Sequence, residues 1–205
     1  MPVKVNAHET NVGFGLGVAR STLYLARNIN SNNDALGLNV GMTFDRGNYF
    51  RGSLEYNYYQ SINIKPTWYN VSAHTIEMNA NIIAKSRDKS FYFYPITGIS
   101  FNLFKGYFTG VNDYLNLNTI YKRNSEITTR WWGINAGVGA DFNFKHGCVF
   151  SSYRMRLGKV EGFDKFNIMD VYVNLGLRYY ASARELGKIF KGTRSRYTLK
   201  TVNTK

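Results

Sequence analysis

The sequence lacks any long hydrophobic run, which excludes a transmembrane helix, because such a helix needs about 18 consecutive apolar residues. It has a single cysteine, Cys148, so an intrachain disulfide is excluded as well. Proline is scarce, with 3 residues in 205. The mean hydropathy of −0.33 resembles that of a soluble protein. That average is a poor guide to location, because in a membrane β-strand the alternating polar and apolar residues cancel.

Signals for chemistry are also missing. The three histidines, His8, His74 and His146, are far apart and show no metal-ligand spacing. The glycine-rich residues 13–17 are not followed by a helical pattern, so a phosphate-binding loop is not indicated. We find no nucleophile motif with a matching base and no paired cysteines. We therefore expect a protein that is not an enzyme, with no catalytic residue, no cofactor and no metal.

The dominant pattern that is present is strict alternation of apolar and polar residues, which is typical of β-strands. In residues 35–45, one face carries Leu36, Leu38, Val40, Met42 and Phe44, and the other carries glycine and polar residues. The pattern recurs in seven further segments: 11–20, 48–61, 74–85, 90–104, 131–144, 147–158 and 169–179. These are eight strands of about 10–15 residues, each long enough to cross a bilayer when tilted.

The predicted links between these strands alternate in length. Tight turns at 45–48, 86–89 and 145–147 lie between longer links at about 21–33, 62–73, 105–129 and 159–167. This is the layout of an outer-membrane barrel, with short periplasmic turns and long extracellular loops. Lipid offers no hydrogen bonds to a sheet edge, so the sheet must close. We predict an all-β, eight-stranded antiparallel up-and-down transmembrane β-barrel in the outer membrane, with both termini periplasmic.

A soluble ligand-binding barrel would also alternate, with its apolar face turned inward. Two features favour the membrane. The small-polar face fits inside a narrow barrel, and aromatic residues gather near the strand ends, as interfacial girdles require. These aromatic residues are Tyr49, Phe50, Tyr58, Tyr59, Trp68, Tyr69, Tyr92, Tyr94, Trp131, Trp132, Phe142, Phe144, Tyr179 and Tyr180. The start of the chain shows no secretory signal, although a barrel must be exported, so we expect the numbering to begin at a mature or engineered start.

Charged residues fall on the predicted inner face of the barrel, where they must pair, because an eight-stranded barrel has little room for water. We expect an ion-pair network that plugs the lumen; a narrow polar pore is the alternative. An acid pair of Glu55 and Glu77 working in catalysis is not supported by any base or nucleophile. The predicted network is Arg51, Glu55, Glu77, Asp141, Arg154, Arg156 and Arg178.

The glycine-rich strand VGFGLGV and the terminal strand DVYVNLGLRYY resemble the small outer-membrane β-barrel superfamily, which includes OmpX/OmpW-like proteins and the PorT-like barrels of Bacteroidota. The resemblance covers about residues 10–180 and is architectural. It implies a multi-pass barrel surrounded by outer-membrane lipids and lipopolysaccharide. Some members are accessory subunits of secretion or gliding machines. The family's final strand commonly ends in an aromatic residue, which Tyr180 matches, although here 25 residues follow it.

We predict three parts: an N-terminal periplasmic segment (1–10), the barrel (11–180) and a basic periplasmic tail (181–205) that includes a possible short helix. The tail has seven Lys or Arg and one acid. It is either solvated without a partner or binds an acidic protein surface or anionic lipid; nucleic acid is not expected. Candidate partner-binding residues lie in the 105–129 link and the tail: Tyr107, Phe108, Tyr114, Tyr121, Arg184, Lys188, Lys191, Arg194 and Arg196. We expect a structural or accessory subunit with protein partners in the outer membrane or periplasm; the alternative is a narrow passive pore or a small-ligand-binding barrel.

Overall fold

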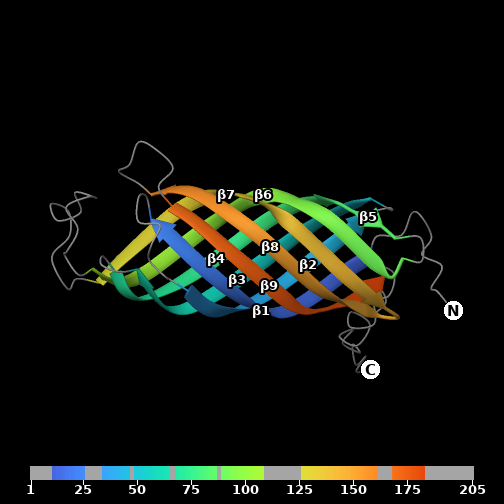
Figure 1. Cartoon of the computed structure of the whole chain (residues 1–205), viewed down its shortest axis with the longest axis horizontal. Coiled ribbons are helices and arrows are strands. Elements are labelled where there is room, and N and C mark those ends of the chain that lie inside the picture. The colour runs from blue at the N-terminus through green and yellow to red at the C-terminus, as the bar shows by residue number, and fades with distance from the viewer. Residues whose placement is uncertain are drawn as a thin grey trace, which may run out of the picture.

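The computed structural model describes residues 11–25, 34–46, 49–64, 68–86, 89–108, 126–160 and 168–182. Within these ranges, antiparallel β-strands run around a single barrel (Figure 1). They are β1 (Asn11–Leu25), β2 (Asp34–Arg46), β3 (Phe50–Ile64), β4 (Trp68–Ile82), β5 (Ala84–Lys85), β6 (Phe91–Phe108), β7 (Glu126–Phe144), β8 (Gly147–Val160) and β9 (Ile168–Ser182). Among the described residues, no helix is long and apolar enough to span a bilayer.

The barrel is closed, with eight long strands around its circumference. Each long strand pairs with the next long strand along the chain, and β1 pairs with β9 over its whole length, from Asn11↔Ser182 to Leu25↔Ile168. The two-residue strand β5 continues β4, because β4 and β5 meet β6 in one unbroken register. The ladder is interrupted at Ile82 and Ile83, opposite Pro95 and Tyr94, and Pro95 has no backbone N–H to donate to it. The predicted all-β, eight-stranded architecture is therefore confirmed.

The pairing register gives the width of the barrel. A path that follows paired residues once around the ladder starts at Gly13 and returns to β1 at Leu23, ten residues further along. The pairs on this path are Gly13↔Thr43, Thr43↔Ser53, Ser53↔Asn79, Asn79↔Gly98, Gly98↔Asn135, Asn135↔Arg156, Arg156↔Asp170 and Asp170↔Leu23. This displacement of ten residues is the shear of the barrel. In a barrel of eight strands, it sets a strand tilt of about 40° and a backbone radius of about 8 Å. Side chains fill an interior of that size.

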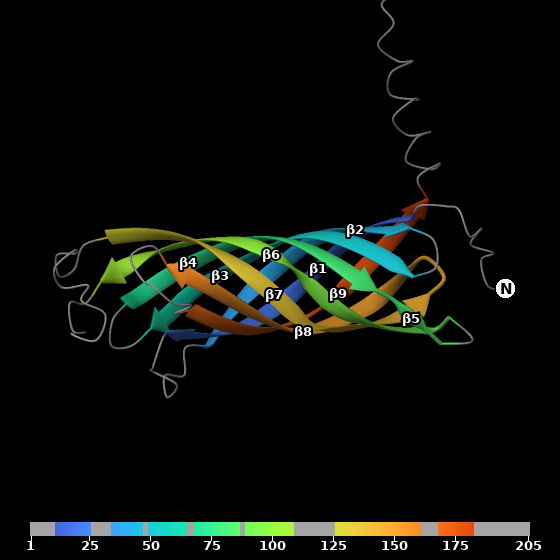
Figure 2. The same ribbon diagram turned by 90° about the horizontal axis from the view of Figure 1, so that it is seen from above.

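The two faces of the wall differ in chemistry. Large apolar side chains project outward from every long strand, with Leu16 on β1 63% exposed and Leu177 on β9 61% exposed. Asparagines, serines, acids and arginines project inward and are almost fully buried. Figures 1 and 2 show the strands crossing the barrel obliquely in both views. An apolar exterior around a polar interior is the arrangement of a membrane barrel and the reverse of a soluble one.

Several strand ends differ from the predictions. The link predicted at 62–73 is mostly strand, since β3 runs to Ile64 and β4 starts at Trp68. Register shifts between Tyr59 and Ile64 interrupt the period-two pattern there, which hides the strand in the sequence. The other three long links also shrink, because β1, β6, β7 and β8 extend into them. Tyr107 and Phe108 therefore lie at the end of β6 and not in a loop.

Some aromatic residues predicted to form the interfacial girdles point into the barrel instead. Tyr59, Tyr94 and Trp131 are each at most 2% exposed. Tyr94 lies over Gly139 and Trp131 lies over Gly158, on neighbouring strands where a Cβ would collide with the aromatic ring. Trp132, by contrast, is 66% exposed on the outer face. Alternation along the strand therefore decides whether a ring points into or out of the barrel, and a glycine on a neighbouring strand leaves space for each inward ring.

Candidate functional site

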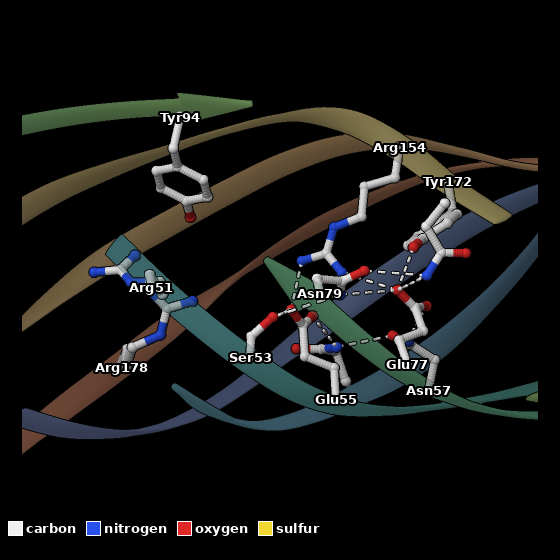
Figure 3. A network of polar contacts seen from close by, with 12 residues as sticks. Arg51, Ser53, Glu55, Asn57, Glu77, Asn79, Tyr94, Arg154, Tyr172 and Arg178 are labelled. Atoms are coloured by element: carbon white, nitrogen blue, oxygen red, sulfur yellow. Dashed lines mark hydrogen bonds and ion pairs between the residues drawn. The ribbon is translucent and has the colours of Figure 1, made fainter. Parts of the chain in front are cut away.

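The candidate site is the interior of the barrel, where charged side chains gather in two clusters. We name its two ends by the chain. The turn end holds Asn11, Ser182 and the reversals between β2 and β3, β5 and β6, and β7 and β8. The loop end is the opposite one. Figure 3 shows the two groups separately, with Arg51, Arg178 and Tyr94 apart from Glu55, Glu77 and Arg154.

The turn-end cluster consists of Asp45, Arg51, Asp141 and Arg178. Arg51 binds Asp45 through its Nε (2.6 Å) and Asp141 through its Nη1 (2.5 Å). Arg178 Nη1 donates to the same oxygen of Asp141 at 3.0 Å. The hydroxyl of Tyr94 donates to the other oxygen of Asp141 at 2.8 Å. The cluster contains two carboxylates and two guanidinium groups, so its formal charge is zero.

The central cluster consists of Glu55, Glu77, Arg154, Arg156 and Asp170. Arg154 bridges Glu55 (2.7 Å) and Glu77 (3.0 Å). Arg156 bridges Glu77 (2.5 Å) and Asp170 (2.6 Å). The chain of charges thus runs Glu55–Arg154–Glu77–Arg156–Asp170 and connects β3, β4, β8 and β9 across the lumen. Every side chain in it is at least 95% buried.

Neutral side chains complete the coordination of the acids. The Tyr172 hydroxyl donates to Glu77 Oε2 at 2.6 Å, and Asn57 Nδ2 donates to Glu77 Oε1 at 2.8 Å. Asn39 Nδ2 donates to Glu55 Oε2 at 3.2 Å. The Arg156 guanidinium also lies 4.5 Å from the centre of the Tyr172 ring, within the range of a cation–π contact. Charges with this many partners are costly to separate, so the two clusters link the strands across the interior of the barrel.

Aromatic and aliphatic residues line the lumen beyond the charges. Towards the loop end, the rings of Phe104 and Trp131 meet edge to face, 5.6 Å between centroids, and both are buried. Towards the turn end, Ile83 packs with Tyr94 and Ile96. The described interior therefore contains ion pairs, buried amide and hydroxyl groups, and buried aromatic and aliphatic side chains. Such an interior can occlude a passage, and among the described residues no group of three or more His, Cys, Asp or Glu is placed to hold a metal.

The structure brings all seven residues of the sequence-predicted network inside the barrel. Arg51, Asp141 and Arg178 lie in the turn-end cluster, and Glu55, Glu77, Arg154 and Arg156 lie in the central cluster. Two members were missed, Asp45 and Asp170. Both stand on the polar side of the strand alternation, so their position along the strand was the signal that could have found them. The other candidates, Tyr114, Tyr121 and the tail residues Arg184, Lys188, Lys191, Arg194 and Arg196, lie outside the described residues.

Comparison with solved structures identifies the fold. The barrel superposes on Neisserial surface protein A with a TM-score of 0.61 and 14% identity, covering 83% of this chain and 96% of that chain. It matches Ail, the attachment invasion locus protein of Yersinia pestis, with a TM-score of 0.56 and 13% identity, covering 86% and 100%. The chain has the fold of the small eight-stranded outer-membrane β-barrels. A major outer membrane protein from Thermus thermophilus is also similar, with a TM-score of 0.50 and 12% identity over 82% and 99%.

Sequence comparison adds no narrower assignment, since no protein-family model and no curated protein matches this chain. Identities of 12–14% show a shared fold and no shared activity. The function must therefore be argued from the lumen and from the two ends of this barrel.

Proposed function

We propose that this protein is a non-enzymatic barrel of the bacterial outer membrane that acts as a structural or accessory subunit of a larger assembly. Its short turns and both termini face the periplasm in this proposal, as in the usual outer-membrane layout. The observation that carries it is the filled interior, in which the arginines of both charge clusters bind acids on other strands across the lumen. A barrel that transports nothing acts through its ends and through its membrane-facing wall.

The turn end supplies a surface suited to an acidic partner. Arg46, Lys89 and Lys145 are exposed there, on three different hairpins. Asp45, the nearby acid, is held by Arg51 inside the barrel. Beyond Ser182 the chain continues from this same end with seven Lys or Arg and one acid. This concentration of positive charge favours binding to an acidic protein surface in the periplasm.

The assembly we propose is a secretion or gliding machine of the outer membrane. This narrower proposal is supported only by the resemblance of the terminal strands to the PorT-like barrels, some of which serve as such subunits. Co-purification from native membranes in mild detergent tests it directly. Recovery of outer-membrane or periplasmic secretion components with the barrel is the expected result, and recovery of the barrel alone contradicts it.

The tail can be tested separately with a variant in which five of its seven basic residues become glutamine, which lowers its side-chain charge from +6 to +1. We expect this variant to recover at least tenfold less of the partner, because the positive surface is lost. A matched control, Lys105→Gln with Arg130→Gln, removes charge from the outer face near the loop end and leaves recovery unchanged. Equal recovery by both variants excludes the tail. The five substitutions are Arg184→Gln, Lys188→Gln, Lys191→Gln, Arg194→Gln and Arg196→Gln.

The alternative function, a narrow passive pore, is distinguished by conductance. The purified protein is inserted into a planar lipid bilayer, with a general porin in the same bilayer as the control for detection. A closed lumen gives no steady current steps. Reproducible open channels from the wild-type protein would refute the plugged barrel and favour the pore.

A further inference from the structure

The central cluster has one negative charge too many. It contains three carboxylates, on Glu55, Glu77 and Asp170, and two guanidinium groups, on Arg154 and Arg156. All five side chains are at most 5% exposed. If every group carried its usual charge at neutral pH, this part of the lumen would have a net charge of −1.

The described surroundings contain no further cation to balance it. The polar groups facing the cluster from the other strands are neutral: Ser21 of β1, Asn39 of β2, Asn57 and Tyr59 of β3, Thr75 of β4, Ser100 and Asn102 of β6, Asn135 of β7, and Tyr172 and Asn174 of β9. Arg178 also lies within electrostatic range of Glu55, but Arg51 and Arg178 are matched in charge by Asp45 and Asp141 in the turn-end cluster. The two clusters together therefore have five carboxylates and four guanidinium groups. Lys85 lies at the turn end, half-buried over the ring of Tyr92.

An unbalanced charge in so dry a site is expensive, and buried acids respond to it by taking up a proton. We propose that the central cluster binds one proton in the folded barrel and that Asp170 carries it. The reaction is a proton transfer: as the barrel forms, an O–H bond of a hydronium ion breaks, an O–H bond forms on the carboxylate of Asp170, a water molecule is released and the cluster becomes neutral. The proposal depends on the charge count and geometry of the lumen and is independent of the accessory role.

The contacts single out Asp170 among the three acids. Glu77 binds both arginines and accepts further hydrogen bonds from Tyr172 and Asn57. These partners all stabilise the ionised form of Glu77. Among the described residues, Asp170 contacts one guanidinium, that of Arg156, and its other oxygen accepts a hydrogen bond from the Ser21 hydroxyl, at 2.5 Å. A hydroxyl can accept as well as donate, so the proton on Asp170 has a partner at Ser21.

Glu55 is better held than Asp170. Its oxygens accept from Arg154, from the hydroxyl of Ser53 at 3.0 Å and from the amide of Asn39 at 3.2 Å. Amide N–H groups cannot accept a proton in return, so the contact with Asn39 requires an acceptor oxygen on Glu55.

The test is infrared spectroscopy of the folded barrel in lipid vesicles at neutral pH, with the aspartate carboxyl carbons labelled with carbon-13. Wild-type protein is expected to show the carbonyl stretch of a protonated aspartic acid. Asp170→Asn is expected to abolish that band. Asp141→Asn, the same change in the balanced cluster, is expected to retain it.

Two results would overturn the proposal: the absence of any protonated-acid band in the wild type, and a band that persists unchanged in Asp170→Asn. If Asp170→Asn does not fold, Ser21→Ala serves instead, since losing the hydroxyl partner must shift the wild-type band if Asp170 carries the proton. An unshifted band then rejects the assignment. A bound sodium ion is the competing source of positive charge. If replacing sodium by choline in the buffer lowers the free energy of unfolding of the wild type, the ion is established and the proton is rejected.

Discussion

Asp141→Asn removes one charge from the turn-end cluster and leaves Arg51 and Arg178 facing a single remaining acid. Asp141 lies 2.5 Å from one guanidinium and 3.0 Å from the other. At an effective dielectric constant of about 20, each contact corresponds to a gross attraction of about 6 kcal/mol. Desolvation of the three ions offsets most of this sum. We therefore expect the free energy of unfolding to fall by about 3–5 kcal/mol, as when one partner of a buried pair is removed.

The measurement is urea-induced unfolding from lipid vesicles, followed by tryptophan fluorescence and by the gel mobility of the unheated barrel. Asp170→Asn is a matched comparison, because it is the same substitution in the same lumen. If Asp170 is already neutral, this variant loses less than half as much stability as Asp141→Asn.

A double-mutant cycle refines the test. Arg178→Met removes the second guanidinium partner of Asp141, so the double variant Asp141→Asn/Arg178→Met restores the charge balance of the cluster. We expect the double variant to be more stable than the sum of the two single losses predicts, with a coupling of about 0.5–3 kcal/mol. Strictly additive losses would refute the claim that these two side chains stabilise one another.

Further predictions concern the wall of the barrel and use the same unfolding assay. Gly158→Ala places a methyl group against the Trp131 ring and is expected to cost about 1–3 kcal/mol. Gly52→Ala, where no atom lies within 4 Å of the new Cβ, is its control and should change stability by less than about 0.5 kcal/mol; equal losses would contradict the packing argument. Leu175→Arg puts a charge on the lipid-facing side, where Leu175 is 52% exposed, and is expected to cost about 2–4 kcal/mol. An unchanged unfolding midpoint for that variant would show that this face does not meet lipid.

The alternation of residues along each strand was sufficient to predict the barrel and the face on which each charge lies. It succeeded because period two is a property of the strand itself and needs no knowledge of neighbouring strands. The same rule applies to aromatic residues. The prediction of outward-facing girdles was wrong for Tyr94 and Trp131, because both occupy inward positions in the alternation of their strands. Trp132 points outward, so its neighbour Trp131 has to point inward.

The strand ends were less predictable, for a local reason. Between Tyr59 and Ile64 the pairing of β3 with β4 shifts twice, and each shift moves the apolar residues out of phase. In the sequence the alternation therefore stops at this point, although the hydrogen-bonded ladder between the two strands continues. Tyr107 and Phe108 were placed in a loop for a similar reason, because aromatic residues on successive positions do not alternate.

The sequence alone could not predict which charges pair with one another. Alternation shows whether a side chain faces the lumen or the lipid, but it does not show the height of that side chain along the barrel. Arg154 and Glu55 are 99 residues apart and meet only because the ladder returns ten residues displaced after one circuit. Sliding one strand by two residues would leave every side chain on its original face, so the apolar exterior would be equally satisfied. The same slide would move Arg154 about 7 Å along the strand and break its contacts with Glu55 and Glu77. The buried ion pairs therefore distinguish the native register from shifted ones that the lipid-facing residues tolerate, and this gives the charges a structural role even where nothing passes through the lumen.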